Sequence, residues 1–207
     1  MNFNEVQQQA LFDLLTWRRD TRHFETTPVD DVTLAKLHQA MELAPSVGNA
    51  RPWRVFNVSS LDKRGQVRAE FLKCNQQAEE KYEGPTRDAY KKLKLAGLDM
   101  APVQLAVFTE TAPEEGRGLG RQTMPETLAQ STSMAIFSLW LTARSCNLGV
   151  GMVSILDPRR METLFDVPSS WRFNAYLCIG HPSFQDDTPL LHKVGWQENT
   201  SNTWEEV

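Results

Sequence analysis

A long apolar segment from Thr127 to Cys146 constrains the fold more than any other feature of the chain. The segment is too long for one strand and apolar on nearly every face. It therefore predicts a helix that is buried by the rest of the domain or by a second subunit. Asn147-Leu148-Gly149 follows it as a left-handed helix cap would. The rest of the domain or a second subunit must supply the apolar surface that encloses this helix.

Shorter segments of helical and strand character alternate irregularly on both sides of this central helix. Helical patterns predict helices at about 6–17, from Asp30 or Asp31 to 44, twice on the surface within the charged stretch 62–94, and at 158–165. Short apolar runs predict strands at 53–58, 103–109, 150–155 and 173–179. This order is typical of an α+β domain.

Length and charge limit the classes of protein further. The 207 residues contain no repeat or linker, so we expect a single domain over 1–207 with a polar C-terminal arm at about 185–207. Lys and Arg number 22 against 26 Asp and Glu, which disfavours a nucleic-acid binder. No apolar run reaches the roughly 20 residues that cross a bilayer, so we expect no membrane partner. A polar start and three widely spaced cysteines favour a reduced, cytoplasmic protein.

Three arginines lie together where the first predicted helix ends: Arg18, Arg19 and Arg22. Guanidinium groups bind phosphate through paired hydrogen bonds, so the cluster could hold a phosphorylated ligand. A solvated basic cap on the helix is the alternative, and local sequence favours it. Asp20 within the cluster likewise reads as a salt-bridge partner of these arginines.

Other candidate features carry less information by themselves. The turn Ser46-Val47-Gly48 offers free backbone donors to a flat ligand or a phosphate. There is no Walker loop and no Gly-x-Gly-x-x-Gly turn, which disfavours ATP hydrolysis and a Rossmann site. The four histidines are scattered, so we expect no metal site. Cys146 and Cys178 lie in apolar segments and are expected to be inert.

The order of several motifs resembles the nitroreductase-like flavoproteins, and within them the members that fragment their flavin. The matching segments cover most of the chain from Trp17 to Pro182. They are Trp17-Arg-Arg-Asp-Thr-Arg-His-Phe24, Ala44-Pro-Ser-Val-Gly48 with Pro52-Trp53, Leu93-Lys-Leu-Ala-Gly97, Leu119-Gly-Arg-Gln-Thr-Met-Pro-Glu126, Leu139-Trp-Leu-Thr-Ala-Arg144, Gly149-Val-Gly-Met-Val-Ser-Ile155 and Tyr176-Leu-Cys-Ile-Gly-His-Pro182.

This resemblance implies roles for particular residues. Asp20 and Ser154 match the pair tied to flavin fragmentation, which an ordinary nitroreductase does not need, so the functional interpretation of Asp20 now outweighs the salt bridge. The remaining matches would bind the flavin, with the arginines on its phosphate and ribityl chain. They are Arg18, Arg19, Arg22, Ser46, Val47, Gly48, Pro52, Lys94 and Gly151.

The resemblance also implies a fold and a reaction. The fold would be a mixed sheet surrounded by helices, in a homodimer with flavin sites at the interface. Reduced FMN, supplied by a separate flavin reductase, would be the substrate and molecular oxygen the co-substrate. The products would be 5,6-dimethylbenzimidazole, the lower ligand of cobalamin, and erythrose 4-phosphate. A lid could lie within 62–94.

Two departures from the family pattern affect the site. Leu128-Ala129-Gln130 stands where the family often has Asp and Tyr. Gln197-Glu198-Asn199 stands where it often has arginines, and Lys193 is close enough in sequence to replace that phosphate contact.

Two other functions are compatible with the sequence. One is an FMN-dependent NAD(P)H reductase of nitro compounds or quinones that keeps its flavin, for which Asp20 and Ser154 are not needed. The other is a non-catalytic flavin-binding protein. Turnover with NAD(P)H and the fate of the flavin ring distinguish the three.

Overall fold

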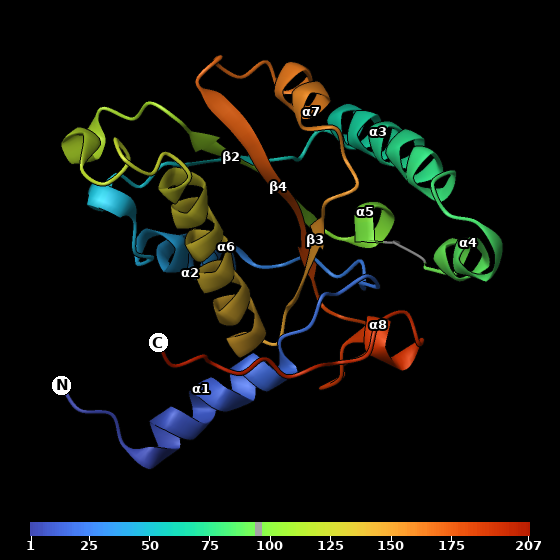
Figure 1. Ribbon diagram of the computed structural model, residues 1–207, viewed down its shortest axis with the longest axis horizontal. Helices are drawn as coiled ribbons and strands as arrows, with labels where there is room; N and C mark the ends of the chain where they lie inside the picture. The colour runs from blue at the N-terminus through green and yellow to red at the C-terminus, as the bar shows by residue number, and fades with distance from the viewer. Residues whose placement is uncertain (94–96) are drawn as a thin grey trace.

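The computed structural model describes residues 1–93 and 97–207, and a four-stranded sheet of order β1-β2-β4-β3 lies at its centre (Figure 1). Each neighbouring pair of strands is antiparallel. Within the described residues, parallel pairing occurs in an isolated bridge between Asp20 and Val150. The strands are β1 (Trp53–Asn57), β2 (Val103–Glu110), β3 (Gly149–Val153) and β4 (Trp171–Gly180).

The two central strands, β2 and β4, are buried on both faces. Successive side chains of a strand point to opposite faces of the sheet, and here each face has its own apolar cluster. On β4, for example, Leu177 and Ile179 belong to one cluster, whereas Tyr176 and Cys178 belong to the other. Helices must therefore cover the sheet on both sides.

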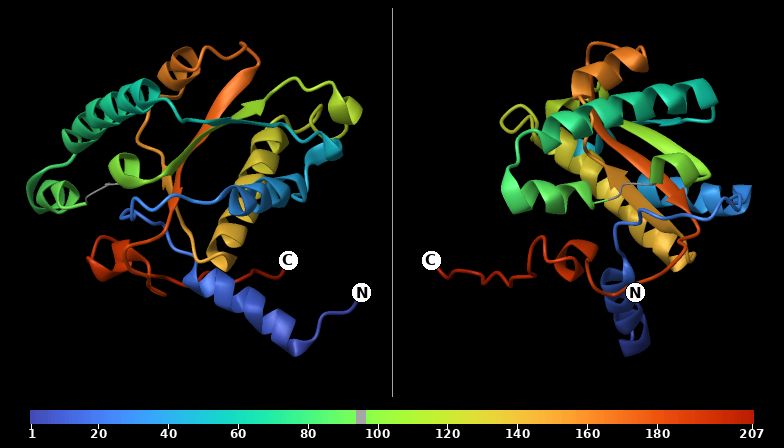
Figure 2. Two further views of the ribbon diagram at one scale, coloured as in Figure 1. Left: turned by 180° about the vertical axis from the view of Figure 1, so that it is seen from behind. Right: turned by 90° about the vertical axis from the view of Figure 1, so that its right-hand side faces the viewer.

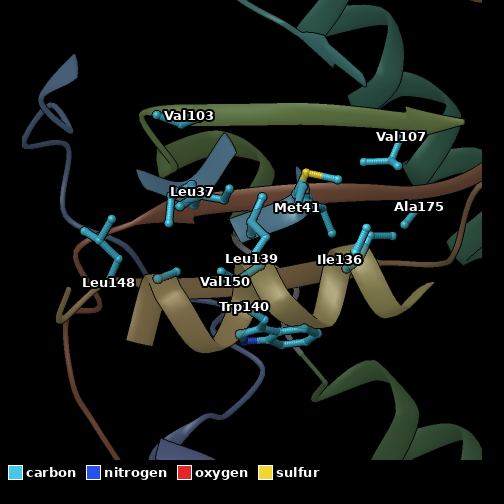
Figure 3. Close-up of a cluster of buried hydrophobic side chains, with 14 of the residues drawn as sticks. Leu37, Met41, Val103, Val107, Ile136, Leu139, Trp140, Leu148, Val150 and Ala175 are labelled. Atoms are coloured by element: carbon cyan, nitrogen blue, oxygen red, sulfur yellow. The ribbon is translucent and has the colours of Figure 1, made fainter. Parts of the chain in front are cut away.

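One face of the sheet is covered by α6 (Thr127–Ser145) and α2 (Asp31–Glu42), which pack against each other. Figure 3 shows Ile136 and Leu139 of α6 pointing toward the strands, with Leu37 and Met41 of α2 beside them. Trp140 projects from the opposite side of α6. The apolar segment around which the fold was predicted is thus a central helix with eight buried residues.

The other face is covered by α3 (Leu61–Glu79), α5 (Gly97–Met100) and α7 (Pro158–Leu164). Val67 and Phe71 of α3 pack there with Met161 of α7. The two helices predicted in the charged stretch 62–94 are α3 and α4 (Gly84–Lys91), and α3 also contributes to the core. Figure 2 shows the two layers of helices on either side of the sheet.

The peripheral elements are α1 (Glu5–Trp17), α8 (Leu190–Lys193) and the 3-10 turns η1 (Val47–Asn49) and η2 (Glu115–Gly118). Helix α1 has no buried residue and projects from the rest of the chain (Figures 1 and 2). Both termini lie at the end of the molecule that carries α1 and α8 (Figures 1 and 2).

Most of the predicted elements are confirmed, and their caps explain the boundaries. Helix α2 begins after Asp30, whose carboxylate accepts a hydrogen bond from Thr33 N. Helix α6 ends before Asn147, whose φ of 60° is the predicted left-handed cap. The sequence pattern did not predict α5 and α8, each of which is a single turn.

Candidate active site

The segment that follows α1 holds the Asp20 carboxylate against β3. Thr21 N donates a hydrogen bond to Val150 O (3.0 Å), which forms the parallel bridge. Asp20 Oδ1 accepts a hydrogen bond from Met152 N (3.0 Å), and Oδ2 accepts one from Arg22 Nε (3.1 Å). Both oxygens are fixed, and each keeps a lone pair for a further donor. Since 38% of the side chain is exposed, a ligand can reach it.

Two glycines of β3 permit this close approach. A Cβ atom at Gly151 would lie 2.2 Å from Thr21 O, and one at Gly149 would lie 2.4 Å from Thr21 Oγ1. Any larger residue at either position would push the Asp20 segment away from the strand. Gly151, whose predicted contact with flavin stays a prediction, therefore helps to position Asp20.

A pocket of about 110 Å³, here called the Asp20 pocket, brings Asp20 and Ser154 together. Arg22, Gly151 and Cys178 are among its other lining residues. Ser154 is exposed, and within residues 1–93 and 97–207 its hydroxyl has no hydrogen-bond partner on the protein. The hydroxyl is thus available to a ligand in the same pocket as the carboxylate.

A second pocket, of about 240 Å³, adjoins the first and is here called the arginine pocket. It shares Asp20 and Arg22 with the Asp20 pocket, and its other lining residues are Arg18, Arg19, Pro189, Leu190 and Leu191. The three predicted arginines thus meet in one place. The other lining residues come from the beginning of α8 and its N-cap.

The three arginines differ in how many of their donors remain available. Arg19 is used by the protein itself, because Nε and Nη2 donate to Asp187 O (2.8 and 2.5 Å) and Nη1 donates to Arg18 O (2.8 Å). The Arg18 guanidinium lies 5.0 Å from the centre of a Trp140 ring. Arg22 Nη1 is buried with no hydrogen-bond partner among the described residues. Arg18 and Arg22 are therefore the two that can bind an anion.

Burial changes the ionisation of two groups that line these pockets. Partial burial and the neighbouring Arg19 charge lower the pKa of the Arg18 guanidinium from its usual value. Burial, reinforced by the Asp20 charge, raises the pKa of the Cys178 thiol to about 12. The Cys178 thiol stays protonated at neutral pH, which fits the expectation that it is inert.

Four of the predicted site residues lie outside both pockets within one chain. Ser46, Val47, Gly48 and Pro52 line neither pocket, and Figure 1 shows η1 on the far side of α6 from β3. Val47 N donates to Ser131 Oγ (3.0 Å), which ties the turn to α6. Lys94 lies outside the described residues.

Three further findings concern residues for which the sequence pattern predicted another role or none. Lys193 Nζ pairs with Asp186 and does not line the arginine pocket. Leu190 and Leu191 form a wall of that pocket, and the signal for them was an isolated apolar pair in a polar arm. Cys178 lines the Asp20 pocket, but its apolar strand gave no indication of this.

Two classes of feature are absent from the described part of the chain. Residues 1–93 and 97–207 contain no cluster of three or more His, Cys, Asp or Glu side chains that could bind a metal ion. Within these residues no helix is both long enough and apolar enough to cross a membrane.

The chain belongs to the nitroreductase family, whose family model matches residues 15–181. It is 54% identical over 205 residues to a 5,6-dimethylbenzimidazole synthase of Rhodobacter capsulatus, with 99% of each chain covered. It is 47% identical over 195 residues to the protein of the same name from Rhodospirillum rubrum, with 94% of this chain and 92% of the relative covered.

Solved structures show the same fold. An iodotyrosine deiodinase bound to FMN and 3-iodo-L-tyrosine superposes with a TM-score of 0.73 at 23% identity, over 95% of this chain and 97% of the other. A nitroreductase from Exiguobacterium sibiricum in complex with FMN gives a TM-score of 0.64 at 14% identity, over 86% and 90% of the two chains. The α+β nitroreductase-like fold predicted from the sequence is confirmed.

Proposed function

We propose that this protein converts reduced FMN, with molecular oxygen, to 5,6-dimethylbenzimidazole and erythrose 4-phosphate. One observation carries the proposal: Asp20 and Ser154 line a single pocket that shares Asp20 and Arg22 with an arginine-lined pocket. The names of relatives 47–54% identical to this chain support the same reaction.

The residues present fit FMN. The arginine pocket holds an anion-binding pair, Arg18 and Arg22, and Arg22 Nη1 has no partner among the described residues. A buried guanidinium donor without a partner costs free energy, which a phosphate or ribityl oxygen would recover. Reduced FMN, once bound, supplies the electrons that reduce oxygen. Arg18 and Arg22 would orient its phosphorylated chain so that the ring system lies toward the Asp20 pocket.

Asp20 and Ser154 would act on the part of FMN that reaches the Asp20 pocket. The backbone N–H of Met152 and the guanidinium of Arg22 fix the carboxylate, so Asp20 can accept a proton from the ring or ribityl carbon with little reorganisation. The Ser154 hydroxyl can donate a hydrogen bond to the oxidised ring and orient it. Neither the proton transfer to Asp20 nor the hydrogen bond from Ser154 requires a charged side chain from outside the two pockets.

A homodimer would complete this site. Pockets of about 110 and 240 Å³ are smaller than the roughly 300–1,000 Å³ of most cofactor sites, so one chain supplies only part of the enclosure. Helices α1 and α6 pack together and leave large apolar side chains in water. These include Phe12 (62% exposed) and Phe137 (42% exposed). A second copy on this face would cover them and could bring its Ser46–Gly48 turn to the pocket.

Phe12→Glu tests the homodimer. We expect the wild-type protein to have twice the 23.6 kDa mass of one chain, and the variant to be largely monomeric because a charge is costly in an apolar interface. Light scattering after size exclusion measures both masses. Leu61→Glu is the matched control, since Leu61 is an exposed leucine (82%) at the start of α3. A wild-type monomer, or a Phe12→Glu dimer, would contradict the assembly.

The reaction itself is tested by product analysis. The purified protein is incubated aerobically with FMN, NADPH and a separate flavin reductase, and 5,6-dimethylbenzimidazole is measured by mass spectrometry. We expect product that requires both this protein and oxygen, with no NADPH oxidation when the reductase is omitted. Intact flavin with NADPH oxidised in the absence of the reductase would identify a nitroreductase that keeps its cofactor. Stoichiometric FMN binding without either reaction would identify a flavin-binding protein.

A further inference from the structure

Three aromatic rings join two parts of the chain that are far apart in sequence. Tyr82 and Tyr90 stack with their centroids 5.0 Å apart. Trp196 packs edge-on against Tyr82 at 5.7 Å and lies 6.2 Å from Tyr90. All three side chains are partly buried. We call this cluster the aromatic latch, because it connects the α3–α4 hairpin to the C-terminal arm.

On the hairpin side of the latch, a hydrogen bond and two ion pairs connect α3 to α4. Tyr90 Oη donates a hydrogen bond to Asn75 Oδ1 (2.7 Å), which ties α4 to α3. Glu79 of α3 pairs with Arg87 (3.0 Å) and Lys91 (3.4 Å) of α4. A change in the packing of Tyr82 or Tyr90 is therefore expected to affect all of α4. Figures 1 and 2 show α4 beside α8.

The arm side of the latch leads directly to the arginine pocket. Trp196 N donates a hydrogen bond to Leu191 O (2.9 Å). Gly195 precedes it with a φ of +71°, a conformation that favours glycine and turns the chain back after α8. Leu190 and Leu191 line this pocket together with the arginines. The tryptophan is thus one hydrogen bond away from a residue that would contact the bound ligand.

We propose that Trp196 is a positioning residue that clamps the α3–α4 hairpin onto the C-terminal arm and thereby controls how long the flavin stays bound. This inference rests on the proposed function for the identity of the ligand, which is FMN. With the latch closed, α4 holds α8 in place and Leu191 walls the phosphorylated end of FMN. With the latch open, α8 loses this support, and the pocket opens on that side.

The contacts of the latch suit a reversible clamp. Aromatic pairs at these separations are individually weak, and the trio is exposed enough for water to replace its contacts. α8 is a single turn, too short to hold its position without packing against a neighbour. Arg19 holds the arm at Asp187, before α8, and Trp196 supplies the packing contact that follows α8.

Trp196→Ala and Trp196→Phe test the inference. FMN is bound to the full-length protein, and its dissociation after dilution is followed by the recovery of flavin fluorescence. We expect Trp196→Ala to release FMN about tenfold faster than the wild type, a factor that corresponds to 1.4 kcal/mol. Trp196→Phe should restore most of the retention, because a ring can still pack against Tyr82. A double-mutant cycle with Tyr82→Ala should be non-additive.

A second readout does not require flavin. Amide hydrogen exchange of residues 84–91 in the ligand-free protein should rise in Trp196→Ala. Val194→Ala is the matched control in the same turn, since Val194 is 55% exposed and is not part of the aromatic latch, and it should change neither measurement. Unchanged exchange in α4 with an unchanged FMN dissociation rate would overturn the latch. A wild-type protein that fails to bind FMN would instead contradict the proposed function, and the exchange measurement alone would then decide on the latch.

Discussion

Asp20→Asn is expected to lower the rate of 5,6-dimethylbenzimidazole formation by at least about 100-fold, the usual contribution of a positioned acid or base. Asparagine keeps the shape of aspartate but cannot accept a proton at neutral pH. Its amide oxygen can still accept the hydrogen bond from Met152 N. We therefore expect FMN affinity to stay within about a factor of three of the wild-type value. Product formation and a flavin titration measure the two quantities on the same preparation.

Asp99→Asn is the matched control for this substitution. Asp99 also pairs with an arginine, Arg68, and both side chains are half exposed, but neither residue lines the Asp20 pocket or the arginine pocket. We expect Asp99→Asn to make product at the wild-type rate. Product formation by Asp20→Asn at the wild-type rate would show that the assigned role is wrong. Loss of FMN binding in that variant would show that Asp20 serves to hold Arg22 for the ligand.

Gly151→Ala is expected to destabilise the fold by about 1–3 kcal/mol, the usual cost of overpacking. The added methyl group would meet Thr21 O, a backbone atom that cannot rotate away. The Asp20 segment must then move from β3, and the bond from Met152 N to Asp20 weakens with it. The melting temperature should fall by roughly 2–4 °C for each kcal/mol in a chain of this size. The rate of product formation should fall as well.

Gly65→Ala is expected to change the stability of the protein in the opposite direction. Gly65 lies in α3, and a Cβ atom there meets nothing within 4 Å. Alanine should stabilise the protein by about 0.4–1 kcal/mol through the entropy of the unfolded chain. Differential scanning calorimetry of both variants tests the pair. Equal stability of Gly151→Ala and the wild type would show that Thr21 does not need the close approach to β3.

The elements that the sequence predicts well are those with a strong local signal. The 127–146 segment combines length, unbroken apolar character and an Asn-Leu-Gly ending, and the structure has α6 with Asn147 as its cap. The single turns α5 and α8 have too few residues for a periodic pattern, so they were missed. Strand order is a tertiary property, and nothing local indicates that β4 lies between β2 and β3.

The sequence predicted several residues of the candidate site but not how they are arranged. The motifs predicted Asp20 and Ser154 as site residues, and in the structure both line one pocket. Their flavin chemistry stays a prediction. Local sequence could not distinguish Arg19, whose donors are used by Asp187 O, from Arg22, which keeps a buried donor free among the described residues. That difference depends on the arm folding back from 168 residues away.

In the proposed homodimer, the exposure of α1 would link catalysis to protein concentration. A helix of 13 residues with no buried side chain is marginal in water by itself, so in the proposed homodimer the second copy would add to the support that α1 receives from α6. Its last residue, Trp17, directly precedes the segment that carries Arg18 and Asp20. On dilution, fraying of α1 would therefore spread into the pocket before the sheet is affected. Specific activity would fall at low enzyme concentration and recover on concentrating the sample.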